Sequence, residues 1–225
     1  APEIRVALIS GAGRLNFYTP ITLLFLSYRF PPVSTPGCLR LYHLYREAGP
    51  YFGRRLVLTS ANRRLMAVDE QLDLRLELLE TLPTLDLRRF YLRRRRGNTV
   101  EAGLKERPAA QVLARLTDSF PGSVLWGDGG LVYILAGYRR GKQLVEREGV
   151  THLFSSFRPI ADHAVAALLK RRFPQLVWIA DYRDLPVNRP LDNVYWPRLQ
   201  HAWQRRLLRR ADLVTTVSAG LARQL

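Results

Sequence analysis

The stretch LVWIADYRD, residues 176–184, decides the fold prediction, because an apolar run changes abruptly into charged residues. The apolar part has the composition of a strand that is buried on both faces, as in a parallel sheet, and we predict a strand over residues 176–181. Asp181, Arg183 and Asp184 lie at its carboxyl end. Ligands of open α/β sheets bind outside this end of the strands, so the three charged residues are a candidate site. The alternative is that they pair with one another and cap the next helix.

Strand-like and helix-like segments alternate along the chain, which predicts an α/β, Rossmann-like parallel sheet with helices on both faces. Strands are expected at residues 21–27, 55–59, 73–78, 151–155, 176–181 and 212–218. Helices are expected within residues 37–48, 108–117, 131–147, 161–172 and 197–210. In the third strand, leucines alternate with charged residues, which indicates a strand near a sheet edge or with one solvated face.

Residues 1–20 fit this pattern least well. An apolar run at residues 4–9 is followed by Gly-Ala-Gly at residues 11–13, which resembles part of a dinucleotide-binding fingerprint. Asn16 stands where the third glycine of that fingerprint is needed. We expect residues 1–20 to be an extension or an added strand, and residues 21–225 to form a single Rossmann-like domain.

Composition excludes several classes of protein. The 225 residues are 47% hydrophobic, which is normal for a globular core and too high for a disordered chain. One cysteine, Cys38, and four histidines supply neither an internal disulfide nor a metal-ligand spacing. No apolar run is long enough to span a bilayer, and the first residues do not read as a secretory signal. We therefore expect a cytoplasmic domain that needs no metal and no cofactor.

The net charge of +16 predicts attraction to polyanions such as an anionic membrane surface, nucleic acid or phosphorylated substrates. One basic cluster interleaves arginine with aromatic residues, which suits a segment lying on anionic lipid. A second cluster lines a helical stretch, and for both clusters the alternative is a solvated face. The first cluster contains Arg88, Arg89, Arg93, Arg94, Arg95 and Arg96, and the second contains Arg205, Arg206, Arg209 and Arg210.

Four stretches carry a resemblance to a known family. They are LLFLSYRFPPVSTPGCLRLYHL (residues 23–44), THLFSSFRPIADHAVAALLKRRFP (151–174), LVWIADYRDLP (176–186) and RRLLRRADLVTTVSAGLARQL (205–225). In this order and spacing the chain resembles the N-terminal half of family-4 type, or group 1, glycosyltransferases with the GT-B fold. Two departures stand out: a Ser-Thr-Pro loop at residues 34–36 replaces the usual Gly-Gly, and Leu185-Pro186 replaces a Pro-Trp pair.

The resemblance implies a function. In this family the N-terminal domain holds the acceptor, a second domain holds a nucleoside-diphosphate sugar, and the sugar is transferred with retention and without a metal ion. We therefore expect an acceptor-binding domain whose C-terminal donor domain is absent from this sequence and which is inactive by itself. The expected acceptor is a cell-envelope glycan or a lipid-linked molecule. The expected location is cytoplasmic, either free or peripheral on the inner face of the plasma membrane.

The resemblance also assigns site residues. The loop with Ser34, Thr35 and Gly37 would face the donor diphosphate, because the following helix presents its positive N-terminal end. Asp181, Arg183 and Asp184 would shape the acceptor side, with Arg183 braced by the carboxylates; a purely architectural network is the alternative.

A further group lies after the strand at residues 151–155. Arg158 and Asp162 would contact acceptor or donor, and His163 is the catalytic candidate because its ordinary pKa is near neutral. Asp162 has an alternative role as a helix N-cap, and His163 has one in capping or packing.

Three rival functions remain open from the sequence. A nucleic-acid-binding module would fit the charge, but no zinc spacing or aromatic RNA-binding signature is present. A dinucleotide-dependent oxidoreductase would need the glycine-rich fingerprint that the chain lacks. A non-catalytic basic α/β domain would keep the fold without the chemistry.

Overall fold

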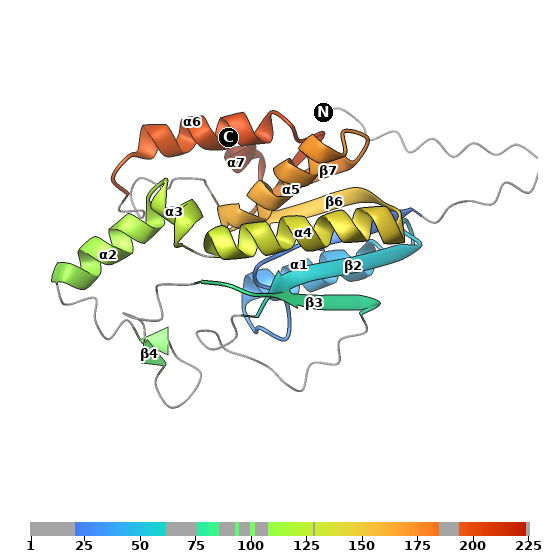
Figure 1. Ribbon diagram of the computed structural model, residues 1–225, viewed down its shortest axis with the longest axis horizontal. Coiled ribbons are helices and arrows are strands. Elements are labelled where there is room, and N and C mark those ends of the chain that lie inside the picture. Colours follow the sequence, from blue (N-terminus) through green and yellow to red (C-terminus); the bar gives the residue numbers. More distant parts are fainter. Residues whose placement is uncertain are drawn as a thin grey trace, which may run out of the picture.

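The computed structural model describes residues 21–61, 76–85, 93–94, 100–101, 108–127, 129–184 and 194–223. Its centre is a six-stranded parallel sheet with the strand order β3-β2-β1-β6-β7-β8 (Figure 1). The strands are β1 (Thr22–Leu26), β2 (Arg54–Ser60), β3 (Leu78–Leu82), β6 (Val150–Phe157), β7 (Val177–Tyr182) and β8 (Leu213–Thr216). Helices cover this sheet on both faces, so the predicted α/β, Rossmann-like fold is confirmed.

The strand order reverses at β1. From β1 the chain adds β2 and β3 on one side, and later adds β6, β7 and β8 on the other side. Leu24 of β1 pairs with Leu56 of β2 and with Leu153 of β6, so β1 lies in the middle of the sheet. Loops that leave the carboxyl ends of β1 and β6 turn to opposite faces, and the crevice between such loops is where open α/β sheets bind ligands.

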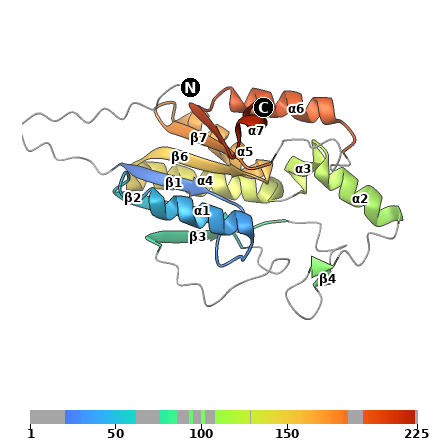
Figure 2. The same ribbon diagram turned by 180° about the vertical axis from the view of Figure 1, so that it is seen from behind.

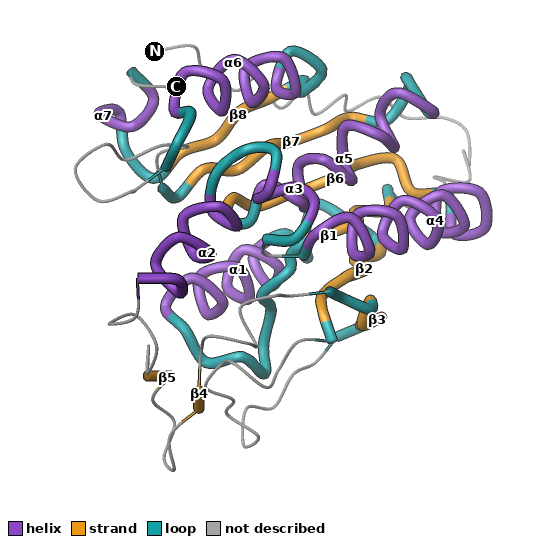
Figure 3. The backbone as a smooth tube through the Cα atoms, turned by 60° about the vertical axis from the view of Figure 1, so that its left-hand side comes forward, coloured by secondary structure: helices purple, strands orange, loops and turns teal. Residues whose placement is uncertain are grey.

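The helices form a layer on each face, as Figures 2 and 3 show from two further directions. The helices are α1 (Pro36–Glu47), α2 (Pro108–Asp118), α3 (Gly122–Leu125), α4 (Gly130–Glu148), α5 (Ile160–Arg172), α6 (Pro197–Leu208) and α7 (Ala219–Ala222). Helix α1 packs on one face against Leu23 and Phe25 of β1. Helices α4, α5 and α6 pack on the other face, where the alternate residues Leu24 and Leu26 point.

Local sequence explains where α1 begins and which side it buries. Thr35 is the N-cap, its hydroxyl accepts a hydrogen bond from the Cys38 N–H, and Pro36 occupies the first helical position. Cys38, Leu41, Tyr42 and Tyr45 are buried, and their spacing of three and four residues places them on one side of the helix. The cap therefore fixes the start of α1 at the carboxyl edge of the sheet.

Helix α4 approaches α5 closely because two glycines of α4 face α5. A Cβ atom on Gly137 would lie 2.9 Å from Val165 Cγ2, and one on Gly141 would lie 2.7 Å from Leu169 Cδ1. Gly149 then ends α4 in the left-handed conformation, with φ of 62°, which glycine adopts without a steric penalty. The long helix is thus held tightly against the layer that supports β6.

The expected elements overlap the observed ones, and the poorest agreement is at the third strand. Of the strand expected at residues 73–78, residues 73–75 lie outside the described residues, and in the rest only Leu78 is in a strand, because β3 spans Leu78–Leu82. Its register explains the position: Leu78 pairs with Leu56 of β2, and Leu82 is buried. The expectation of an edge strand is confirmed, because β3 ends the sheet.

Several shorter elements were not expected from the sequence. They are α3, α7 and a two-stranded antiparallel sheet of β4 (Arg93–Arg94) and β5 (Val100–Glu101). The predictions for residues 1–20 and for Arg88, Arg89, Arg95 and Arg96 lie outside the described residues, and the membrane role of Arg93 and Arg94 stays a prediction. None of the described helices is both long enough and apolar enough to cross a membrane.

Candidate functional site

A polar pocket lies at the point where the strand order reverses. About 380 Å³ of space, shared with solvent at its mouth, is enclosed by the loop after β1, the start of α1 and the ends of β6 and β7. Its described lining includes four arginines and no acidic side chain. The lining residues are Ser27, Arg29, Thr35, Gly37, Cys38, Arg40, Leu41, Ser156, Phe157, Arg158 and Arg183.

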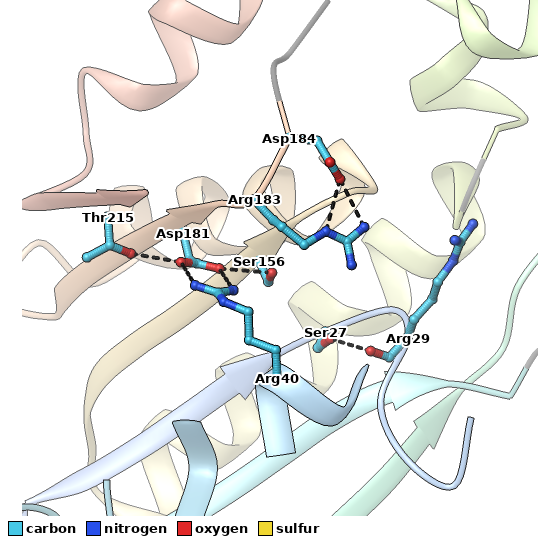
Figure 4. Close-up of polar contacts among 8 residues, drawn as sticks. All are labelled: Ser27, Arg29, Arg40, Ser156, Asp181, Arg183, Asp184 and Thr215. Carbon is cyan, nitrogen blue, oxygen red and sulfur yellow. Dashed lines mark hydrogen bonds and ion pairs between the residues drawn. The ribbon is translucent and has the colours of Figure 1, made fainter. Parts of the chain in front are cut away.

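One wall of the pocket is fixed by the carboxylate of Asp181. This side chain is 1% exposed, and both of its oxygens accept hydrogen bonds from Arg40, at 2.7 and 2.8 Å (Figure 4). The hydroxyls of Ser156 and Thr215 also donate to it, at 3.2 and 3.0 Å. The hydrogen bond from Arg40 to Asp181 is the main reason that the pKa of Arg40 is raised. Asp181 therefore holds Arg40, and its oxygens are occupied by protein donors.

Arg183 reaches into the pocket from the end of β7. Its guanidinium donates to Asp184 Oδ2 at 3.1 and 2.9 Å, and both side chains are about two-fifths exposed. It also lies against the first turn of α1, since a Cβ atom on Gly37 would be 1.7 Å from Arg183 Nη1. The expected brace for Arg183 thus comes from Asp184, while Asp181 braces Arg40 instead.

The loop expected to face a diphosphate forms the N-terminal end of α1. Thr35 and Gly37 line the pocket, whereas Ser34 is exposed and does not. The Thr35 hydroxyl donates to Cys38 Sγ at 2.9 Å and accepts from the Cys38 N–H, so it is occupied by the cap. Pro36 has no N–H, and the Thr35 carbonyl accepts from the Leu39 N–H. The Gly37 N–H is the first-turn donor that no described residue uses.

Arg29 and Arg158 complete the cationic lining. Arg29 lies in the loop after β1 and lines the pocket, and Ser27 Oγ donates to its carbonyl oxygen at 2.8 Å (Figure 4). Arg158 follows β6 directly, and its guanidinium carbon lies 5.7 Å from the centroid of the Phe157 ring. Arg158 lines the pocket, and its contact with acceptor or donor stays a prediction.

Asp162 lies beneath the pocket and does not line it. It is fully buried in the first turn of α5, where it accepts hydrogen bonds from the Tyr28 N–H at 2.8 Å and the Tyr133 hydroxyl at 2.7 Å. Burial raises its pKa from 3.8 to about 7 despite these hydrogen bonds. The N-cap alternative is also wrong, since the N-cap is Pro159. Asp162 instead anchors the loop that carries Arg29.

His163 is likewise part of the core. It is 0% exposed, its Nδ1 lies 2.7 Å from Ser155 Oγ, and its ring lies 4.9 Å from that of Tyr182 between centroids. Trp178 Nε1 donates to the same Ser155 oxygen at 2.8 Å, so this hydroxyl joins the indole and the imidazole in the core. Burial lowers the pKa of His163 to about 3, so the ring is neutral at neutral pH. This position is wrong for a group that exchanges protons with a bound substrate.

Seven of the eleven lining residues were not assigned to a site from the sequence: Ser27, Arg29, Cys38, Arg40, Leu41, Ser156 and Phe157. Arg40 carried a weak signal, because it lies one turn beyond a Thr-Pro-Gly helix start. Cys38 gave no signal of its own. Burial is the main cause that raises the pKa of its thiol, so the sulfur is protonated at neutral pH. Among the described residues, no group of three or more His, Cys, Asp or Glu side chains gathers in a way that could hold a metal ion.

No family model, curated protein or solved structure matches the chain. The resemblance of the four stretches to group 1 glycosyltransferases is therefore carried forward only as a proposal.

Proposed function

We propose that this chain is the N-terminal, acceptor-binding domain of a retaining, metal-independent glycosyltransferase. The enzyme would transfer a sugar from a nucleoside-diphosphate sugar to a cell-envelope glycan or a lipid-linked acceptor. The donor would be held mainly by a second domain, as the resemblance implies, and no cofactor would be needed beyond this co-substrate.

The observation that carries the proposal is the convergence of the four resembling stretches. They lie far apart in the sequence. The first supplies β1 and α1, the second supplies β6 and α5, the third supplies β7, and the fourth supplies β8. Three of them line the pocket, and the fourth contributes Thr215, which donates to Asp181 behind Arg40. Motifs that were noticed separately in the sequence thus meet at one edge of the sheet, which is the edge that binds ligands in this architecture.

The chemistry of the pocket supports the same proposal. Breaking the bond between a sugar and a nucleoside diphosphate leaves negative charge on the diphosphate, which arginines and backbone N–H groups stabilise. Arg40, Arg183 and Gly37 line the pocket, and Gly37 lies close to the Arg183 guanidinium. A lining rich in arginine suits phosphate-bearing ligands and disfavours apolar ones.

The role that we assign to each residue follows from its position. Arg183, Arg40, Arg158 and Arg29 bind substrate, and the Gly37 N–H donates to an anionic oxygen. Asp181 and Asp184 orient the arginines. His163 and Asp162 support the pocket from the core, so we assign no proton transfer to His163.

Hydrolysis and transfer assays test the proposal on the gene product that carries this sequence. We expect one nucleoside-diphosphate sugar of a broad panel to be hydrolysed slowly without an acceptor, and we expect EDTA to leave the rate unchanged. A folded protein that is inert toward every donor would overturn the proposal and favour the non-catalytic basic α/β domain.

A further inference from the structure

Helix α6 and the residues that flank it carry a strongly basic outer face. We name as the α6 face the exposed side chains of Trp196, Arg198, Leu199, Ala202, Arg205, Arg206, Arg209 and Arg210. We propose that the α6 face docks on an anionic lipid bilayer. This surface is separate from the pocket, and the inference does not depend on the proposed sugar transfer.

Helical spacing places these side chains on one side. Arg198, Ala202, Arg205 and Arg209 follow one another at intervals of three or four residues, as do Leu199, Ala202, Arg206 and Arg210. The opposite side of the helix is buried at Gln200 and Gln204, which are 8% and 3% exposed. The helix is thus seated on the protein by one side, and its arginine-bearing side faces outward.

The α6 face has charge of a single sign. Five arginines lie between residues 196 and 210, and this segment contains no aspartate or glutamate. None of the five has an ion-pair partner within the part of the chain that the structure describes. Each basic side chain near an anionic membrane contributes about 1 kcal/mol of attraction, so five of them form a substantial electrostatic anchor.

Apolar side chains accompany the arginines. Trp196 and Leu199 are 50% and 49% exposed, although they are large and hydrophobic. Tryptophan prefers the boundary between water and lipid, where its ring is buried and its N–H stays hydrated. A mixture of arginine with exposed tryptophan and leucine is typical of helices that lie in the membrane interface. Nucleic acid would satisfy the charges but would leave the leucine without a partner.

The position of α6 allows such contact. The helix runs along the outer side of the molecule in Figure 1, and Figure 3 shows it near the edge strand β8. It packs inward through Leu207 and Leu208, which join the core on the α5 side of the sheet. The arginine-bearing side of α6 is therefore exposed with respect to the described elements.

Vesicle binding tests the inference with the 225-residue chain itself. We expect the chain to sediment with phosphatidylcholine vesicles that contain phosphatidylglycerol, and not with pure phosphatidylcholine. Replacing two arginines (R205Q together with R209Q) should lower the partition coefficient roughly 25-fold, since about 1 kcal/mol per residue corresponds to about fivefold. The matched control is R139Q together with R147Q, which removes the same charge from exposed positions of α4 and should change the coefficient less than about twofold.

Two further readouts separate the possible partners. Substituting W196A should weaken binding at every salt concentration, whereas the effect of the α6 arginines should shrink as salt rises. Circular dichroism and thermal melts establish that each variant is folded. Equal losses of vesicle binding in the α6 double variant and the α4 double variant would overturn the inference, because net charge alone would then explain binding. The inference would also be overturned, in favour of a nucleic-acid surface, if the chain bound an RNA oligonucleotide more tightly than vesicles and the α6 double variant lost that RNA binding.

Discussion

Asp181 at the end of β7 and Arg40 in helix α1 are 141 positions apart in the sequence and are joined by two hydrogen bonds, of 2.7 and 2.8 Å. The carboxylate is buried, and the guanidinium is partly exposed at the pocket wall. This pairing ties the helix on one face of the sheet to the strand that carries Arg183. The shape of the pocket therefore depends on a buried charge that is compensated from another element.

Replacing Arg40 with leucine removes this compensation. A buried carboxylate that loses its partner is strongly destabilising, so we expect R40L to lower the free energy of unfolding by about 3 kcal/mol. Chemical denaturation measures this change. The matched control is R46L, an exposed arginine of the same helix, which should cost no more than about 0.5 kcal/mol. If R40L costs no more than R46L, Asp181 does not need Arg40.

A substitution at Gly37 tests the role of Arg183, because it displaces the Arg183 guanidinium. An alanine there would place its methyl group 1.7 Å from Arg183 Nη1, so the guanidinium must move away. The arginine is flexible and 41% exposed, and we therefore expect G37A to change stability by less than about 1 kcal/mol. Binding of inorganic pyrophosphate to the pocket should weaken roughly tenfold, as measured by calorimetric titration. Unchanged pyrophosphate affinity would show that Arg183 does not bind the anion.

Asp162 should make stability depend on pH. Its pKa is about 7 in the folded chain and 3.8 in the unfolded chain, so the folded chain binds the proton more tightly. The contribution of Asp162 to the free energy of unfolding therefore falls as the pH rises from about 4 to about 7, by at most about 4 kcal/mol.

The variant D162N removes the titration and retains both contacts of this site. Its amide oxygen accepts from the Tyr28 N–H as Asp162 does, whereas its NH₂ group donates to the Tyr133 hydroxyl, which reverses the direction of that hydrogen bond. We expect D162N to be at least as stable as the natural chain at pH 8, with the difference shifting in favour of the natural chain by pH 5. Denaturant titrations at several pH values measure this difference, and a difference that is constant with pH would contradict the assignment.

His163 should not titrate near neutral pH. Burial lowers its pKa to about 3, and its Nδ1 is held by the Ser155 hydroxyl. Its imidazole NMR signals should therefore stay at the neutral-ring positions between pH 8 and pH 5. A midpoint near pH 6 for His163 would show that the ring is accessible to solvent.

The fold was predictable because buried parallel strands leave a plain signal. Apolar runs such as the one in β7 and their alternation with amphipathic helices led directly to the sheet. The third strand was expected too early because leucines alternate with charged residues from Leu72 to Leu78, whereas β3 begins at Leu78. Its Glu80 pairs with Arg140 of α4, and no local pattern reveals a partner 60 residues away.

The site was predictable at the end of β7 and less so elsewhere. Asp181 and Arg183 stood out because charge follows an apolar run, but Arg40 reaches the same place from a helix and looks like an ordinary surface residue in the sequence. Asp162 and His163 were misjudged because residues 160–167 are buried throughout. Helix α5 is covered by the sheet, α3, α4 and α6, so its first turn has no solvated side. The periodicity of residues within a helix does not reveal how many neighbours cover it.

The most direct test of the account is the turnover of R183A in the gene product that carries this sequence, measured together with its free energy of unfolding. Arg183 is exposed, and the hydrogen bonds described for its side chain go to Asp184. We therefore predict that R183A changes the free energy of unfolding by less than about 0.5 kcal/mol. Turnover of the nucleoside-diphosphate sugar should fall at least about 100-fold, as expected when a charged group that contacts the leaving diphosphate is lost. Loss of turnover and stability in equal measure, or unchanged turnover, would contradict the placement of the active site at this pocket.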